Sequence, residues 1–138
     1  WSLACHFSAY SMFFFPFGHL IGPLVVWLSR RDSDVTVNEH GKASINFQLT
    51  MTLVFATLMS IIGGFVIFLF ATGAFYTVKD MNINAWTSTV IGSIVAILGI
   101  VLISVFATFY YWVIIAVNGI RAYDGKAASY FPSVRFIK

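Results

Sequence analysis

The side chains of this chain that could do chemistry are few, and its three histidines come first. His6, His19 and His40 could each ligate a metal or a haem iron through a neutral ring nitrogen. A haem bound between helices needs two histidines that face each other. His6 and His19, however, share one interrupted apolar segment, and His40 lies in a polar loop. We therefore expect no cofactor and no metal, and we interpret the histidines as hydrogen-bonded polar residues at interfaces.

Groups typical of catalysis or ion pumping are missing from the rest of the sequence. Cys5 is the single cysteine, so neither an intramolecular disulfide nor a cysteine metal cluster can form. Residues 45–76 and 87–120 hold no charged side chain, whereas pumps usually place an acid or base within a span. Serine-hydrolase, zinc-protease and phosphate-loop motifs are also absent. We expect a protein that is not an enzyme.

Polar residues at helical spacing begin the first long apolar stretch. Asn38, Lys42 and Asn46 recur every four residues, so they share one face of a helix. A second row follows the same spacing and contains Ser44, Gln48 and Thr52. In hydrocarbon the amides of Asn46 and Gln48 need partners. They would either hydrogen-bond a neighbouring helix of this chain or line a wet crevice.

Small residues mark one face of the later apolar stretch. Gly92, Ala96 and Gly99 lie on this face, with Ile103 close by. Small side chains let another helix approach closely in a membrane. That helix could belong to this chain, to another membrane protein or to a second copy.

The composition requires a lipid environment. Charged residues make up 9% of the 138 residues and hydrophobic residues 59%, whereas soluble domains have about 25% charged residues. The net charge of +3 does not indicate nucleic acid, because the bases gather at the ends of apolar stretches, where they orient membrane spans. We expect an all-α integral membrane protein in contact with the bilayer.

The apolar stretches divide the chain into about three transmembrane segments. We predict a single membrane domain at 1–138, with a broken apolar segment at 3–28, a cytoplasmic loop and helix start at 29–44, a transmembrane helix at 45–76, an external turn at 77–86, a second transmembrane helix at 87–120 and a cytoplasmic tail at 121–138. The last two helices would form a long hairpin, and the spacing of Thr36 and Glu39 is that of a capping box at its start.

The first apolar segment is open to two interpretations. Pro16, Gly18, Gly22 and Pro23 interrupt it, and proline removes a backbone donor and clashes with the preceding turn. The two halves could form one kinked span, or a re-entrant hairpin with both ends on the same side. We favour the kinked span, because a re-entrant hairpin buries broken backbone that only protein neighbours can satisfy.

The distribution of basic residues predicts the orientation. The first loop and the tail both carry several Lys and Arg residues, whereas the turn between the long helices carries only Lys79. The positive-inside rule places the first loop and the tail in the cytoplasm. We therefore expect a multi-pass protein of the inner cell membrane with a cytoplasmic C-terminus.

Three blocks carry a resemblance to a known family. They are Pro16 to Leu24 (PFGHLIGPL), Asn38 to Lys42 with Ile45 to Gln48 (NEHGK and INFQ), and Tyr130 to Pro132 with Arg135 to Lys138 (YFP and RFIK). Together they resemble a widespread bacterial family of small multi-span membrane proteins, a domain of unknown function grouped with the channel-like component of the chloroplast inner-envelope translocon, the Tic complex. The resemblance implies a small helical membrane bundle.

The block positions also suggest an interaction or structural site on the cytoplasmic side. It comprises Glu39, His40, Lys42, Asn46, Gln48, Arg135 and Lys138. We expect Arg135 or Lys138 to pair with Glu39 or Asp34 and so fasten the tail. For the whole chain we expect an accessory or scaffold subunit that packs against other membrane proteins or against copies of itself. The alternative, which the resemblance implies, is a translocation or permeation element.

Overall fold

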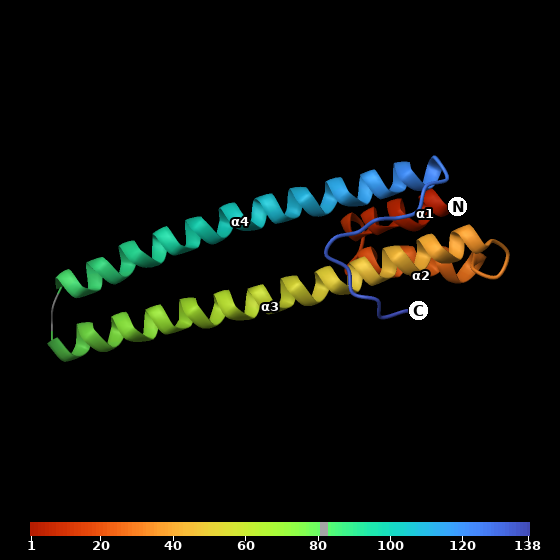
Figure 1. Ribbon diagram of the computed structural model, residues 1–138. Helices are drawn as coiled ribbons and strands as arrows, with labels where there is room; N and C mark the ends of the chain where they lie inside the picture. Colours follow the sequence, from red (N-terminus) through yellow and green to blue (C-terminus); the bar gives the residue numbers. More distant parts are fainter. Residues whose placement is uncertain (81–82) are drawn as a thin grey trace. The chain divides into compact units, whose positions relative to one another are not determined.

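The computed structural model describes residues 1–80 and 83–138, and its regular elements are helices (Figure 1). They are α1 (Ser2–Phe7), the 3-10 helix η1 (Ser8–Phe13), α2 (Gly18–Arg30), α3 (Val35–Asp80) and α4 (Ile83–Tyr123). The chain divides into two compact units. The first unit is Trp1–Val54 with Tyr110–Lys138, and the second unit is Phe55–Phe109.

Two helices of the described chain are long and apolar enough to cross a membrane. Their apolar stretches are Val35–Gly73 and Thr87–Tyr123. An all-α membrane protein is therefore supported, but only these two candidate spans are found among the described residues, against the three segments that we expected. Helix α3 continues to Asp80 and α4 begins at Ile83, so most of the expected turn at 77–86 is helical. Residues 81–82 of that turn lie outside the described residues.

Helix α3 begins earlier than the capping-box spacing predicts. The carboxylate Oδ1 of Asp34 accepts hydrogen bonds from the backbone N–H groups of Thr36 (2.8 Å) and Val37 (3.4 Å). These donors have no partner within the helix, and a short acidic side chain is among the best acceptors for them. Asp34 is therefore the residue that starts the helix, and the predicted role of Thr36 is wrong.

The first apolar segment is a helical hairpin within the first unit. Helix α1 and η1 fold back along α2, and the guanidinium carbon of Arg30 at the end of α2 lies 4.5 Å from the ring centre of Trp1. Both ends of the segment are therefore together. The kinked span that we favoured is wrong, and the arrangement is the one expected of a re-entrant hairpin.

Two glycines of α2 explain why the segment folds back. A Cβ atom on Gly18 would collide with the backbone of Ser11, and one on Gly22 with the backbone of Ser8. The hairpin turns at Pro16 and Phe17, where Phe17 adopts a left-handed conformation with φ of 60°. Of the four predicted helix-breaking residues, Gly22 and Pro23 lie inside α2 and do not end it. The absence of a side chain at Gly22 instead allows close contact with the backbone of Ser8.

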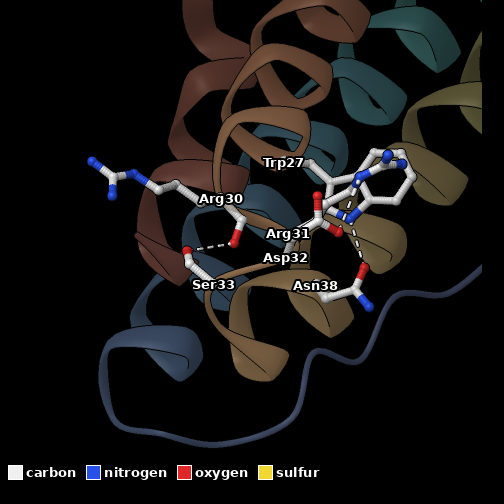
Figure 2. Close-up of polar contacts among 6 residues, drawn as sticks. All are labelled: Trp27, Arg30, Arg31, Asp32, Ser33 and Asn38. Atoms are coloured by element: carbon white, nitrogen blue, oxygen red, sulfur yellow. Dashed lines mark hydrogen bonds and ion pairs between the residues drawn. The ribbon is translucent and has the colours of Figure 1, made fainter.

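Helix α2 is fixed to α3 through a tryptophan and a glycine. The indole Nε1 of Trp27 donates a hydrogen bond of 2.8 Å to Oδ1 of Asn38 (Figure 2). The same indole lies where the Cβ of residue 41 would be, so only glycine fits at Gly41. The guanidinium carbon of Arg31 lies 5.4 Å from the ring centre of Trp27 and covers it.

The second unit has an open surface. Gly73 of α3 approaches the side chain of Thr89 of α4. In contrast, no atom outside the local helix backbone lies within 4 Å of the Cβ position at Gly63, Gly64, Gly92 or Gly99. Within the described part of the second unit, Gly92 and Gly99 of the predicted small-residue face therefore meet no neighbouring helix.

We predict that Gly41→Ala destabilises the protein by about 1–3 kcal/mol, because the added methyl must displace the Trp27 ring in a packed site. Gly63→Ala is the matched control, since its Cβ meets open space and alanine favours a helix. Thermal unfolding in detergent micelles measures both. Equal unfolding midpoints for the two variants would contradict the Trp27–Gly41 packing.

Candidate functional site

The carboxyl-terminal tail is held in the first unit by the side chain of Asn46. Its Oδ1 accepts hydrogen bonds from the backbone N–H groups of Phe136 (3.0 Å) and Ile137 (2.8 Å). Its Nδ2 donates to the carbonyl oxygen of Ile137 at 3.0 Å. Asn46 is 4% exposed, so these bonds satisfy a buried amide that would otherwise carry a desolvation cost of about 1–3 kcal/mol.

Two further side chains of the long helices hold the tail. The hydroxyl of Thr50 donates to the carbonyl oxygen of Asn46 (2.7 Å) and accepts from the N–H of Val134 (2.9 Å). On α4, Oδ1 of Asn118 accepts from the N–H of Ser129 (2.6 Å), and its Nδ2 donates to the carbonyl oxygen of Ser129 (3.0 Å). Each long helix thus contributes a buried asparagine that pairs with tail backbone.

Three polar aromatic side chains, one each from α1, α3 and the tail, form a hydrogen-bonded chain. Nδ1 of His6 is 2.6 Å from the hydroxyl oxygen of Tyr130, and Nε2 of His6 is 3.0 Å from Nδ1 of His40. Tyr130 also stacks on Phe47, with ring centres 4.3 Å apart. These contacts connect α1, α3 and the tail. Cys5 of α1 is also buried, and the Ser44 hydroxyl of α3 donates a 2.8 Å hydrogen bond to its backbone carbonyl.

The geometry of the two histidines is that of a hydrogen bond. The facing nitrogens are 3.0 Å apart, and the ring centres are 5.2 Å apart. Ring centres are this far apart when the two nitrogens point directly at each other. Nitrogens that ligate one metal converge on a third point instead. No group of three or more His, Cys, Asp or Glu side chains suited to a metal is found among residues 1–80 and 83–138.

Burial sets the protonation state of this group. Burial, with a smaller effect of neighbouring His40, lowers the pKa of His6 to about 3. Burial also raises the pKa of Tyr130 above its usual value and that of the Cys5 thiol to about 11. His6, Tyr130 and Cys5 are therefore uncharged at neutral pH, and they serve as hydrogen-bonding side chains.

Gln48 lies one turn further into α3 and joins it to α4. Its Oε1 accepts a hydrogen bond from the hydroxyl of Tyr111. One turn further along α3, the hydroxyl of Thr52 lies 3.0 Å from Nε2 of His19 in α2. Gln48 is fully buried, and no partner is found for its Nε2 within the described residues. The row that contains Gln48 therefore packs against neighbouring helices. Asn46 of the other row bonds the tail instead and lines a hollow beside it.

The charged residues of the predicted site surround a hollow of about 510 Å³. It is lined by Glu39, His40, Lys42 and Asn46 of α3 and by Arg135 and Lys138 of the tail, among others. Gln48 does not line it. Glu39 lies 3.8 Å from Lys42 on its own helix, and no ion pair joins Glu39 or Asp34 to the tail in the described structure. The tail is fastened by Asn46, not by the ion pair that we expected.

Three residues of this site were not predicted from the sequence, namely Thr50, Asn118 and Tyr130. Thr50 continues the spacing of four residues from Asn38 through Lys42 and Asn46, so extending that row would have found it. Asn118 is the one amide in the apolar stretch at 87–120, and an unpaired amide in such a stretch needs a partner. Tyr130 was part of a quoted block, but its contact with His6 depends on tertiary folding.

These features define a small helical membrane protein whose buried polar side chains hold its own tail in place. The chain matches the magnetosome magnetite crystal formation protein family over residues 1–137, and it belongs to that family. The expected small membrane-protein family is thereby shown, but a link to the chloroplast translocon is not. No curated protein matches the chain. No solved structure matches it either.

We predict that Asn46→Leu releases the tail, because it removes three hydrogen bonds to Phe136 and Ile137. In limited proteolysis of the detergent-solubilised protein, the variant should be cleaved after Arg135 at least about tenfold faster than the wild type. This factor corresponds to a loss of about 1.4 kcal/mol or more in the free energy that holds the tail in place. Ser60→Ala is the control, since the Ser60 hydroxyl donates to the carbonyl of Ala56 in its own helix. Unchanged cleavage in Asn46→Leu would refute the role of Asn46.

A second prediction concerns pH. The unfolded chain has a His6 pKa of about 6.5, whereas the pKa is about 3 in the folded protein. Between these values the unfolded state binds a proton that the folded state does not, so stability falls as pH falls. At pH 5.5 the His6 contribution should be smaller than at pH 7.5 by up to about 1.4 kcal/mol. Unfolding midpoints at both pH values measure this loss, which His6→Gln should reduce. An identical pH dependence in His6→Gln would contradict it.

Proposed function

We propose that this chain is a non-catalytic accessory protein of a membrane in which magnetite crystals form, and that it packs against another membrane protein or against copies of itself. The observation that carries the proposal is the family match over residues 1–137. The description of this family names magnetosome magnetite crystal formation as the process in which its members take part. The chain contributes to that process as a structural element and not by turning over a substrate.

The first unit supports a structural role through the use of its polar side chains. Asn46, Thr50 and Asn118 are bonded to the tail, and His6 is bonded to both His40 and Tyr130. A nucleophile activated by a neighbouring base would need an exposed hydroxyl or a thiol of low pKa. The Cys5 thiol has the opposite character, since it is buried and its pKa is raised to about 11.

The second unit supports packing against a further helix. Gly92 and Gly99 have open space where a side chain would begin. The surrounding side chains are apolar and exposed, among them Val95 (64%) and Ile103 (67%). Lipid can cover such a surface, but glycines add close backbone approach, which a neighbouring helix uses better than lipid.

The distribution of charge supports one membrane orientation. Seven of the eight Lys and Arg residues belong to the first unit, and Lys79 alone lies in the second. The positive-inside rule then gives a first unit on the cytoplasmic side of the inner membrane, or of a membrane derived from it, with a cytoplasmic C-terminus. In this orientation the hollow beside the tail faces the cytoplasm.

The translocation alternative has no specific support. It required Asn46 and Gln48 to line one path, but Gln48 is fully buried and does not line the hollow that Asn46 lines. Both side chains are bonded to other parts of the first unit. The alternative would be supported if water-soluble thiol reagents reacted with cysteines introduced at both positions.

We predict that the double variant Gly92→Leu with Gly99→Leu loses most of the protein's effect on crystal size, because the added side chains block approach of a partner helix. The measurement is crystal dimensions in magnetite-forming cells that lack the native chain and carry the variant. Val101→Leu is the control, since Val101 lies on the opposite face of α4 and is 51% exposed.

Two results would contradict parts of this proposal. Normal crystals in cells that lack the chain entirely would refute its role in crystal formation. If deletion alters the crystals but the double variant restores them fully, the Gly92 and Gly99 face is not the packing surface. Immunoblots of the membrane fraction must show equal amounts of both variants for either conclusion.

A further inference from the structure

The hollow beside the tail carries an excess of positive charge that the chain itself does not neutralise. Lys42, Arg135 and Lys138 line it, and Glu39 is the one acid of the described structure that does so. The side chains therefore sum to +2, from three cations and one carboxylate. Lys42 lies 3.8 Å from Glu39, whose side chain is 71% exposed, whereas that of Lys42 is 24% exposed. A single contact of this length to an exposed carboxylate contributes little.

The hollow also offers neutral hydrogen-bond donors and room for a ligand. The hydroxyl groups of Ser129 and Ser133 belong to residues that line it. Its volume of about 510 Å³ lies within the usual range for sites that bind small molecules. Cations that converge with hydroxyl donors on a small space are the chemistry that recognises a phosphate group.

The sequence places this hollow at the boundary between hydrocarbon and water. Lys42 is the last charged residue of α3 before an uncharged stretch that extends to residue 78, and Arg121 is the first charged residue after the apolar stretch of α4. Tyr123 is 80% exposed and Trp1 65%. Exposed aromatic residues next to basic residues are typical of the level of lipid headgroups.

The exposed apolar residues of the tail support the same placement. Ser133, Arg135, Ile137 and Lys138 line the hollow, whereas Val134 (55% exposed) and Phe136 (47% exposed) do not line it. Exposed apolar side chains next to basic residues suit a segment that lies at a lipid interface.

We propose that this hollow binds a phosphate group, and that the phosphate is carried by the headgroup of an anionic lipid. Arg135 and Lys138 hold the phosphate from the tail and Lys42 holds it from α3, so the bound headgroup also bridges the tail and the helix. Asn46 acts as a positioning residue, because it fixes the backbone of Phe136 and Ile137 between the two tail cations. The inference does not depend on which protein the chain packs against.

The test uses the purified full chain in detergent, titrated with short-chain phosphatidylglycerol, short-chain phosphatidylcholine and inorganic phosphate, with bound lipid counted by native mass spectrometry. We expect phosphatidylglycerol to bind at least about tenfold more tightly than phosphatidylcholine, since each base near a lipid surface adds to the attraction. Arg135→Gln with Lys138→Gln should weaken that binding by roughly tenfold or more.

A matched variant controls for total charge. Arg31→Gln with Lys126→Gln removes the same charge from two exposed bases that pair with neighbouring acids and should leave the affinity within about threefold, a difference below 0.7 kcal/mol. Arg135→Lys with Lys138→Arg should restore binding. Equal unfolding midpoints without lipid exclude misfolding as the cause.

Each other outcome has a defined meaning. Equal weakening in the hollow variant and the control variant would overturn the proposal, because total charge alone would then explain binding. Equal affinity for phosphatidylglycerol and phosphatidylcholine would overturn it as well. Inorganic phosphate that displaces phosphatidylglycerol at comparable concentration would keep the phosphate site and overturn the lipid as its source.

Discussion

The buried amide of Asn46 is the interaction on which the first unit depends. It is 4% exposed and lies on the first apolar turns of α3, where an amide without partners is costly. The backbone of Phe136 and Ile137 satisfies it at both ends, with one oxygen accepting two bonds and one nitrogen donating one. The requirement is mutual, because tail backbone lying against apolar helices also needs partners. Asn118 makes the same kind of pairing with Ser129 from α4.

Around this pairing, the buried polar groups form a layer that joins segments distant in sequence. His6 connects the hairpin to α3 through His40 and to the tail through Tyr130, and Trp27 connects α2 to Asn38. Such hydrogen bonds between helices are directional, so they select one arrangement among apolar surfaces that would otherwise pack in several ways. The hollow lined by Lys42, Arg135 and Lys138 exists because the tail is held in this one position.

Hydropathy and spacing predicted the all-helical membrane class, because nearly uncharged stretches of this length are typical of membrane-spanning helices. The grouping of the tail with Glu39, Lys42 and Asn46 was also predicted, but the fastening was assigned to an ion pair. Amide pairing with backbone could not be foreseen, since the backbone partner has no sequence signature. The hairpin was misjudged for a related reason: Pro16 and Pro23 were given equal weight as breaks, whereas the left-handed Phe17 and the contacts of Gly18 and Gly22 decide the fold. Those contacts are set by a neighbour, η1, that local pattern does not identify.

The central claim is that the tail is a fixed part of the first unit, held by backbone hydrogen bonds to Asn46, Thr50 and Asn118. Amide hydrogen exchange of the wild-type protein in micelles, resolved to single residues, tests this most directly. The N–H groups of Ser129, Val134, Phe136 and Ile137 donate to these side chains, so they should exchange at least about tenfold more slowly than expected for an unstructured chain. Exchange of all four at the unstructured rate would contradict the account.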